Sequence, residues 1–274
     1  MKNTHYCTYK KLLVLGLLLL TLGVKGFSQR LVSIPNTLEL SFTSKINKTV
    51  YNLHIALPYQ YEKSKEKYPT VYLLDANSDF PLVTSISRRL EAEDNLKKFI
   101  LVGISYQGSA WEHRRADYTP SFVRNTKNSG GANKFASVIE KEIIPLVEKN
   151  IQVKKNSRTL LGNSLGGLFG AYLLLNGSPI FENYIISSAS MWWDDYYVLK
   201  NSKPPFLKSS IFISVGSLEN PHMIESSKKL KAFIDENLST SKKKIIFPDG
   251  ENHASAKIRA YSDGLRWLFK GEKN

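Results

Sequence analysis

The segment RTLLGNSLGGLFGAYLLL, residues 158–175, constrains the fold more than any other part of the chain. An apolar run, TLL, leads into GNSLG, and an apolar helical pattern follows. These five residues fit G-x-S-x-G, in which Ser164 sits on a sharp turn between a strand and a helix. We expect that side chains at Gly162 and Gly166 would collide with neighbouring backbone, and that Gly167 lets the helix pack closely. The alternative is a Gly-rich turn without chemistry, but the flanking strand and helix favour a nucleophile at the positive end of a helix.

Strand and helix patterns alternate along the rest of the chain. Two alternating runs around Asn47 and Lys48 predict an antiparallel hairpin. Continuous apolar strands indicate that both faces of the sheet are covered, and therefore that it is mostly parallel. We predict an α/β protein with eight strands, the first two antiparallel at one edge, and helices on both faces. The six later strands are expected within YPTVYLLDAN, KKFILVGISY, SRTLLG, FENYIISSAS, SSIFISVG and KKKIIFPDG.

The first 28 residues have the pattern of a secretory signal peptide. A basic stretch precedes a continuous apolar run from Leu12 to Val24, and Gly26 and Ser28 offer small residues at a cleavage site. The alternative is an uncleaved membrane anchor, but the run has 13 residues and a spanning helix needs about 20. We therefore expect a signal peptide at residues 1–28 and one domain at 29–274. The mature protein is expected to be periplasmic or secreted, with no stable membrane anchor.

Removing the signal peptide changes the charge and the cysteine content. The chain has a formal net charge of +14, and residues 1–28 contain four lysines and no acid, so the mature charge is +10. Cys7 is the only cysteine, so the mature chain has no disulfide framework, thiolate metal site or cysteine nucleophile. The remaining lysines are dispersed and accompany no zinc-finger, RNP-type or basic-zipper pattern. We therefore expect no nucleic-acid partner.

A serine nucleophile needs a general base, and in this type of fold the chain order is serine, acid, histidine. His253 lies directly after the last predicted strand, whereas His222 opens the preceding helix and is the alternative. The acid is expected after the seventh strand, where Glu219 is the first carboxylate. Asp194 and Asp195, after the sixth strand, are alternative acids.

An oxyanion hole needs two backbone N–H groups, one after the nucleophile and one after the third strand. Leu165 supplies the first, and Asn77 or Ala76 supplies the second. The resulting chemistry needs no metal and no cofactor.

Several segments together resemble a known family. In chain order they are VYLLDANSDF, LVGISY with RRADYTP, GNSLGG, SSASMWWDD, SVGSLEN and ENHAS. They resemble the bacterial putative-esterase family of α/β-hydrolases, which includes trilactone siderophore esterases and is similar to feruloyl esterases, S-formylglutathione esterases and mycolyltransferases. The resemblance extends from Leu38 to Phe269 and implies an α/β-hydrolase fold.

The resemblance also implies roles for individual residues. Ser164 corresponds to the nucleophile, His253 to the base and Glu219 to the acid, with Asn77 and Leu165 as oxyanion donors. Some siderophore esterases of this family work with a Ser–His dyad, so the contribution of the acid stays open. Asparagine at position 163 replaces a frequent histidine that the chemistry does not require.

The same comparison places Trp192, Trp193 and Arg115 on the substrate side. Adjacent tryptophans point in different directions, so we expect one in the core and one in the pocket. We also expect a structural ion pair between the Arg114–Arg115 pair and Asp117, with anion binding as the alternative for the arginines.

These inferences lead to one hypothesis, a serine esterase that acts on small-molecule esters. Siderophore esters or carbohydrate-linked acyl esters are the expected substrates. An acyltransferase on the same scaffold and a non-catalytic binding protein are the alternatives. The sequence carries no signal that fixes an oligomeric state.

Overall fold

Side chains of the central strands alternate between two hydrophobic layers, and this alternation determines the architecture. In β7, Ile211 and Ile213 enter one layer, whereas Phe212 enters the other. β3 divides its side chains in the same way. Both faces of the sheet are therefore buried, as the continuous apolar runs predicted.

The computed structural model describes residues 32–63, 65–93, 96–202, 208–238 and 241–271. Residues 36–274 form one compact unit, and the expected signal peptide, residues 1–28, lies outside the described residues. The strands are β1 Thr37–Thr43, β2 Val50–Ala56, β3 Tyr68–Leu73, β4 Ile100–Tyr106, β5 Val153–Asn163, β6 Asn183–Ser187, β7 Ser210–Ser214 and β8 Lys242–Ile246. The helices are α2 Ala76–Glu93, α3 Ala110–Tyr118, α4 Ala132–Val138, α5 Ile144–Asn150, α6 Leu165–Leu175, α7 Tyr197–Asn201, α8 Pro221–Asn237 and α9 His253–Phe269. A 3-10 turn, η1, covers Tyr61–Lys63, and a π-helical turn, η2, covers Ile139–Ile143.

The eight strands form one sheet in the order β1-β2-β4-β3-β5-β6-β7-β8. β1 pairs with β2, and β2 with β4, in antiparallel fashion, and all later pairs are parallel. The predicted hairpin is confirmed, and Lys48 in its turn has a φ of 64°. This arrangement is the α/β-hydrolase fold that the sequence predicted.

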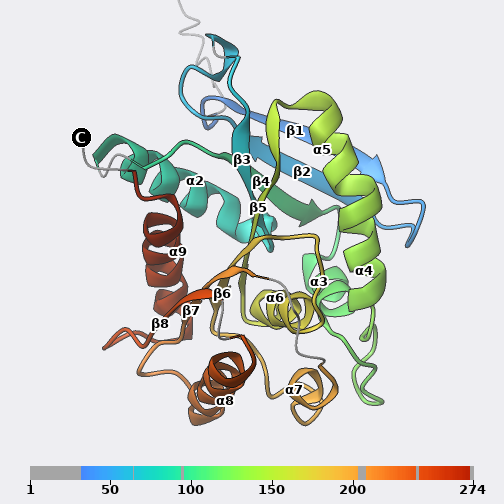
Figure 1. Ribbon diagram of the computed structural model, residues 1–274. Helices are drawn as coiled ribbons and strands as arrows, with labels where there is room; N and C mark the ends of the chain where they lie inside the picture. Colours follow the sequence, from blue (N-terminus) through green and yellow to red (C-terminus); the bar gives the residue numbers. More distant parts are fainter. Residues whose placement is uncertain (1–31, 64, 94–95, 203–207, 239–240, 272–274) are drawn as a thin grey trace, which may run out of the picture. The chain divides into compact units, whose positions relative to one another are not determined.

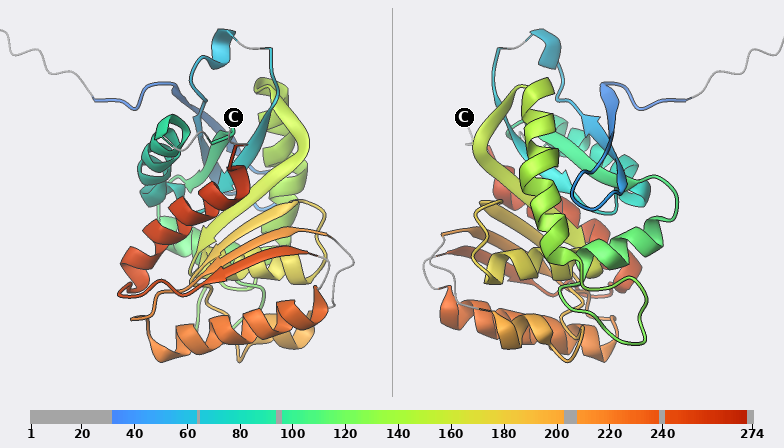
Figure 2. Two further views of the ribbon diagram at one scale, coloured as in Figure 1. Left: turned by 60° about the vertical axis from the view of Figure 1, so that its left-hand side comes forward. Right: turned by 90° about the vertical axis from the view of Figure 1, so that its right-hand side faces the viewer.

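Helices cover both faces of the sheet. α2 and α9 pack together on one face, and α3, α4, α5 and α6 lie on the other, as Figure 1 and the two views of Figure 2 show. The chain reverses direction across the sheet at β3, because β4 lies on one side of β3 and β5 on the other. Open α/β sheets bind ligands at such a switch point, beyond the carboxyl ends of the strands.

One helical segment contains a local irregularity, and two helices, α3 and α7, were not predicted. The amphipathic segment 132–150 forms α4, η2 and α5. The wider π-helical turn ends at Ile143, two residues before Pro145, which has no N–H to donate. α3 was missed because its fully buried residues are Asp117 and Tyr118, so the segment has no apolar helical period.

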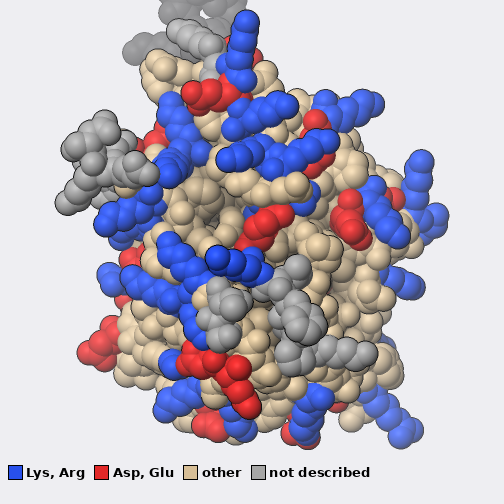
Figure 3. Space-filling model, viewed as in Figure 1, with Lys and Arg blue, Asp and Glu red and all other residues tan. Residues whose placement is uncertain are grey.

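Charged side chains are dispersed over the surface. In Figure 3, Lys and Arg side chains extend over the visible face, and Asp and Glu side chains lie between them. No helix in the described part of the chain is long and apolar enough to cross a membrane.

Candidate active site at the carboxyl ends of the strands

Ser164 connects β5 to α6 in a backbone conformation that non-glycine residues seldom adopt. Its φ is 58° and its ψ is −115°. A Cβ atom at Gly162 would lie 2.5 Å from the carbonyl oxygen of Gly166, so only glycine fits there. The Ser164 N–H donates to the carbonyl of Ser187 at 3.0 Å, which fixes the turn against β6. The hydroxyl is thereby held at the N-terminus of α6.

The two other glycines of the turn differ from each other. A Cβ at Gly167 would lie 2.7 Å from the carbonyl oxygen of Ser187, so the expected close packing of the helix is confirmed. The expected backbone collision at Gly166 is wrong. A Cβ there would meet side-chain atoms of Leu74 and Asp75 at 3.4 Å and 3.5 Å, which is close to ordinary contact.

His253 and Glu219 meet across the carboxyl ends of the last strands. His253 is the first residue of α9, and its Nδ1 lies 2.7 Å from Glu219 Oε2. The second carboxylate oxygen accepts hydrogen bonds from the Ser188 hydroxyl at 2.5 Å and from the Gly216 N–H at 3.0 Å. Three hydrogen-bonding groups therefore surround this buried carboxylate.

These donors control the ionisation of Glu219. Burial by itself raises the pKa of the carboxyl group, but the hydrogen bonds from the histidine, the serine hydroxyl and the backbone N–H outweigh it. The net pKa lies below the ordinary glutamate value. Glu219 is consequently a carboxylate at neutral pH. It accepts a hydrogen bond from His253 when the imidazole carries its proton on Nδ1.

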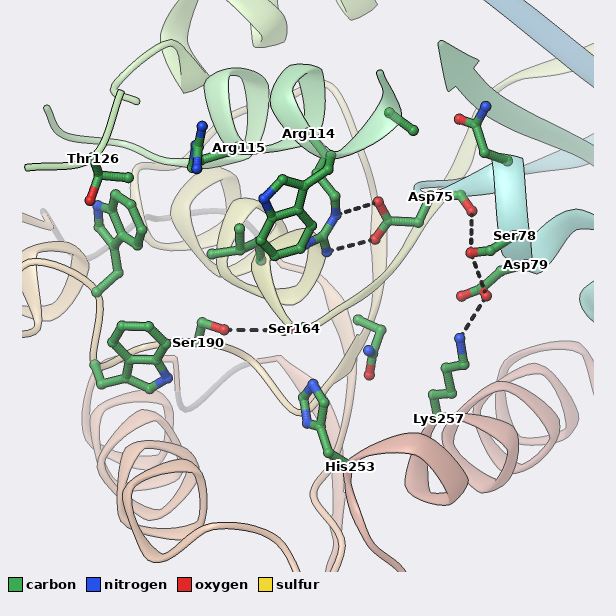
Figure 4. A pocket seen from close by; sticks show the side chains of 17 residues that line it. Asp75, Ser78, Asp79, Arg114, Arg115, Thr126, Ser164, Ser190, His253 and Lys257 are labelled. Carbon is green, nitrogen blue, oxygen red and sulfur yellow. Dashed lines mark hydrogen bonds and ion pairs between the residues drawn. The ribbon is translucent and has the colours of Figure 1, made fainter. Parts of the chain in front are cut away.

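Ser164 and His253 line the same cavity, which has a volume of about 720 Å³ (Figure 4). Ser164 Oγ lies 3.3 Å from Ser190 Oγ, and no hydrogen bond among the described residues joins Ser164 to His253. The histidine side chain is 47% exposed, on the cavity side. Catalytic hydrogen bonds are often long in ligand-free enzymes and shorten when substrate binds.

The alternative base and acids lie elsewhere. His222 occupies the exposed first turn of α8, and its backbone N–H binds the Asn220 side chain. Asp194 and Asp195 are exposed, and Asp195 pairs with Lys200. The carboxylate that contacts His253 is Glu219 alone among the described residues.

The predicted oxyanion donors, Leu165 and Asn77, line the same cavity as Ser164. Leu165 begins α6, and Asn77 lies in the first turn of α2, so their N–H groups have no partner one turn earlier in the same helix. The Asn77 side chain is engaged with the end of β4. It donates to the Tyr106 carbonyl and accepts from the Tyr106 N–H, both at 3.0 Å. Ala76, the alternative donor, is the first residue of the same helix.

The predicted substrate-side residues also line the cavity. Trp193 is buried and donates to the Ser121 hydroxyl at 3.1 Å, whereas Trp192 is 44% exposed. The expectation of one tryptophan in the core is confirmed by Trp193, but both tryptophans line the cavity, so the expectation that only one does so is wrong. Arg115 is half-buried, and its Nε is buried without a hydrogen-bond partner.

The expected ion pair between the arginines and Asp117 is wrong. Arg114 instead pairs with Asp75, 39 residues earlier, through Nε at 2.7 Å and Nη2 at 2.9 Å. Asp117 accepts a hydrogen bond from the Tyr51 hydroxyl at 2.6 Å. The spacing of RRAD in the sequence suggested a local pair, but the helix directs these side chains to different partners.

Several cavity residues were not identified from the sequence, among them Trp111, Lys257 and Asp79. Trp111 is 60% exposed at the cavity, with Arg114 over its ring. Lys257 of α9 pairs with Asp79 of α2 at 2.7 Å. No sequence motif marks the pair of Lys257 and Asp79, because the two residues lie 178 positions apart in the chain. Among the described residues, no three His, Cys, Asp or Glu side chains are grouped so that they could hold a metal ion.

Comparison with known proteins gave consistent matches. The sequence model of the family described as "Putative esterase" matches residues 44–249. The ferri-bacillibactin esterase BesA of Bacillus subtilis is 27% identical over 272 residues, which cover 89% of this chain and 93% of that protein. The siderophore triacetylfusarinine C esterase of Aspergillus fumigatus is 29% identical over 181 residues, which cover 63% of this chain and 62% of that protein. The crystal structure of the BES protein from Bacillus cereus has a TM-score of 0.79 at 31% identity, covering 90% of this chain and 99% of that one.

The burial of Asp117 predicts a dependence of stability on pH. Burial raises the pKa of its carboxyl group from 3.8 to about 6, although the hydrogen bond from Tyr51 opposes this. Between these two pH values, the folded protein thus holds a proton on Asp117 that the unfolded chain has lost. The free energy of unfolding therefore falls as pH rises through this window. Asp117→Asn removes the ionisation and keeps an oxygen acceptor for Tyr51. Relative to wild type, the variant should gain up to about 3 kcal/mol of unfolding free energy between pH 4 and pH 7.

Urea denaturation at several pH values measures this difference. Other titrating groups cancel in the comparison because both proteins contain them. A constant difference between the two proteins across the pH range would contradict the prediction.

Proposed function

The chain belongs to the putative esterase family of α/β-hydrolases, and we propose that this carboxylic ester hydrolase works through a triad of Ser164, His253 and Glu219. The observation that carries the proposal is the 2.7 Å contact between His253 Nδ1 and Glu219, on a histidine that lines the same cavity as Ser164. With Nδ1 bound to the carboxylate, Nε2 is left to accept the serine proton.

In the first half of the reaction, His253 Nε2 removes the proton from Ser164 Oγ as Oγ attacks the ester carbonyl carbon. The carbonyl oxygen takes the displaced electron pair and becomes an oxyanion, which the N–H groups of Leu165 and Asn77 stabilise. The tetrahedral intermediate then breaks its bond to the alcohol oxygen. His253 returns the proton to that oxygen, and the acyl group stays on Ser164.

In the second half, water replaces the alcohol. His253 takes a proton from the water as its oxygen attacks the acyl carbon. The second tetrahedral intermediate then breaks its bond to Ser164 Oγ and releases the acid, and His253 returns the proton to Oγ. Glu219 holds the imidazole in one tautomer and stabilises the imidazolium that forms in each half. The lowered pKa of this carboxyl group supports the role, because the negative charge is present throughout the neutral range.

Substitutions in the triad test this mechanism. Ser164→Ala should lower kcat/KM for p-nitrophenyl acetate by at least about 10³-fold. Glu219→Gln should lower kcat by about 10²–10⁴-fold, because an amide can support the wrong tautomer of His253. Ser262→Ala removes a half-buried hydroxyl of α9 that does not line the cavity, so this control should keep wild-type activity.

Spectrophotometric assays of the folded variants distinguish the outcomes. Equal rates for wild type and Ser164→Ala would refute the serine mechanism. A loss of less than about threefold in Glu219→Gln would instead indicate a Ser–His dyad.

For the substrate, we propose anionic siderophore esters. Two similar proteins are named as siderophore esterases, BesA for ferri-bacillibactin and the Aspergillus fumigatus enzyme for triacetylfusarinine C. The cavity volume of about 720 Å³ suits a ligand much larger than an acetyl group. Trp192 and Trp193 offer aromatic surface, and Arg115 supplies a cation with no ion-pair partner among the described residues. Ferric catecholates are anionic, which matches this guanidinium.

The charge of Arg115 gives a test with an internal control. Arg115→Met should raise KM for a ferric catecholate trilactone at least about tenfold, the loss of one charge-assisted contact, and should leave KM for neutral p-nitrophenyl acetate unchanged. Arg124→Met removes an exposed cation that does not line the cavity and should change neither value. An equal KM for the trilactone in wild type and Arg115→Met would refute the anionic-substrate assignment.

Faster cleavage of feruloyl or acetyl-sugar esters would assign a different substrate, and a transesterified product would identify an acyltransferase.

We also propose that the mature protein acts in the periplasm or outside the cell. The proposal rests on the basic stretch, apolar run and small residues of positions 1–28. Amino-terminal sequencing of protein from the periplasm or medium of an expressing bacterium should give Gln29 as the first residue. Intact chain retained in the membrane fraction would show an uncleaved anchor instead.

A further inference from the structure

The turn from β3 to α2, Leu74–Asn77, lies directly against the nucleophile turn. The Leu74 N–H donates to the Leu161 carbonyl of β5 at 3.0 Å. A Cβ added to Gly166 would touch Leu74 at 3.4 Å and Asp75 Oδ2 at 3.5 Å. Asp75 therefore lies close to the first turn of α6.

Asp75 holds this position in an unfavourable backbone conformation. Its φ is 56°, in the left-handed region that favours glycine. Its N–H donates to the Tyr118 hydroxyl at 3.1 Å. Its carbonyl accepts from the N–H groups of Ser78 and Asp79 at 3.0 Å and 3.1 Å. This backbone conformation of Asp75 persists because two sets of contacts hold it. One set comes from residues outside the turn, and the other comes from the first turn of α2.

The strongest of these contacts comes from Arg114 on α3. Two of its nitrogens donate to the two oxygens of the Asp75 carboxylate, at 2.7 Å and 2.9 Å (Figure 4). The guanidinium also lies over the rings of Trp111 and Tyr118, at 5.2 Å and 5.6 Å from their centroids. Two parallel hydrogen bonds from a planar group that two rings hold in place fix direction as well as distance.

The charge of Asp75 makes its partner important for the reaction. The carboxylate lies beside the N-terminus of α6, where the proposed mechanism creates a negative oxygen. An unpaired carboxylate there would repel that oxygen. Arg114 neutralises it, and both side chains are largely buried, at 14% and 16% exposed.

We propose that Arg114 and Asp75 are positioning residues for the oxyanion hole. This inference rests on the proposed serine mechanism. Arg114 holds Asp75 in its left-handed conformation, which places the Asn77 N–H opposite the Leu165 N–H, and it cancels a carboxylate charge that would oppose the oxyanion. The Asn77 side chain, bonded to the Tyr106 backbone, holds the other end of the turn.

The test measures turnover separately from substrate binding. In Arg114→Met, kcat for p-nitrophenyl acetate should fall about 10²-fold, the size of effect seen when one oxyanion donor is lost. KM for this small neutral ester should stay within about threefold, because no contact with the bound ester is removed. The rate of Ser164 labelling by a fluorophosphonate should fall in parallel, since its phosphoryl oxygen enters the same hole. Arg114→Lys, which keeps the charge and loses the planar fork, should recover part of kcat.

A second pair of variants separates the effect of the Asp75 charge and the effect of lost stability from the effect of displaced oxyanion donors. Asp75→Asn with Arg114→Met removes the unpaired carboxylate and keeps a residue that tolerates a left-handed backbone, so kcat should exceed that of Arg114→Met alone. Arg158→Met is the matched control. Arg158 is 15% exposed and pairs with Glu148 and Glu182 at 3.6 Å, away from the cavity. It should lower stability and leave kcat unchanged.

Circular dichroism establishes which variants are folded, and Arg114→Lys serves as the test if Arg114→Met is not. A folded Arg114→Met variant with kcat within about threefold of wild type would overturn the inference, as would an equal loss in Arg158→Met or, where only Arg114→Lys folds, a wild-type kcat in that variant. The proposed function fails on a different result, equal activity of wild type and Ser164→Ala.

Discussion

The backbone hydrogen bonds that tie each strand end to its neighbour are the constraint on which the site depends. At the carboxyl edge of the sheet, the N–H of a residue just past one strand donates to a carbonyl at or near the end of the next strand. The links are Leu74 to Leu161, Ser164 to Ser187, Ser188 to Ser214 and Val215 to Ile246. They run from β3 to β8 without a break, so the turns that carry the candidate site residues are fixed to one another through the main chain. Side chains placed on such an edge lose little entropy when a reaction needs them in one geometry.

After three neighbouring strands, the chain leaves this edge of the sheet through a residue with the same unusual backbone conformation. Asp75, Ser164 and Ser188 follow β3, β5 and β6, and each has a positive φ although none is glycine. Such a conformation costs of order 1–3 kcal/mol at each position. Each residue has a distinct contact: Asp75 binds Arg114, Ser188 donates to Glu219, and Ser164 presents its hydroxyl to the cavity. The two-layered core beneath the edge supplies the stability that offsets this strain.

The parts that the sequence predicted are those with a local signal. The apolar runs identified the strands, and the glycines around Ser164 identified the turn. The pairing of His253 with Glu219, 34 residues apart, followed from chain order in this fold. The partner of Arg114 could not be found this way, because α3 buries Asp117 and Tyr118 instead of an apolar stripe. A positive φ at a serine or an aspartate likewise leaves no mark in composition, since it is imposed by neighbouring strands.

The distribution of charge in the cavity says more about function than the net charge of +14. Three cations line it, and two of them are neutralised: Arg114 by Asp75, and Lys257 by Asp79. The Lys257–Asp79 pair joins α9 to the first turn of α2, and the Arg114–Asp75 pair joins α3 to the residue before α2. The charges of both cations are therefore compensated within the protein. Arg115 differs, because no acid among the described residues pairs with it. A solvated surface lysine attracts an anion only weakly in salt, whereas a half-buried, unpaired guanidinium attracts it at short range. The selectivity that we propose for anionic esters therefore depends on one side chain inside the cavity and not on the basic surface around it.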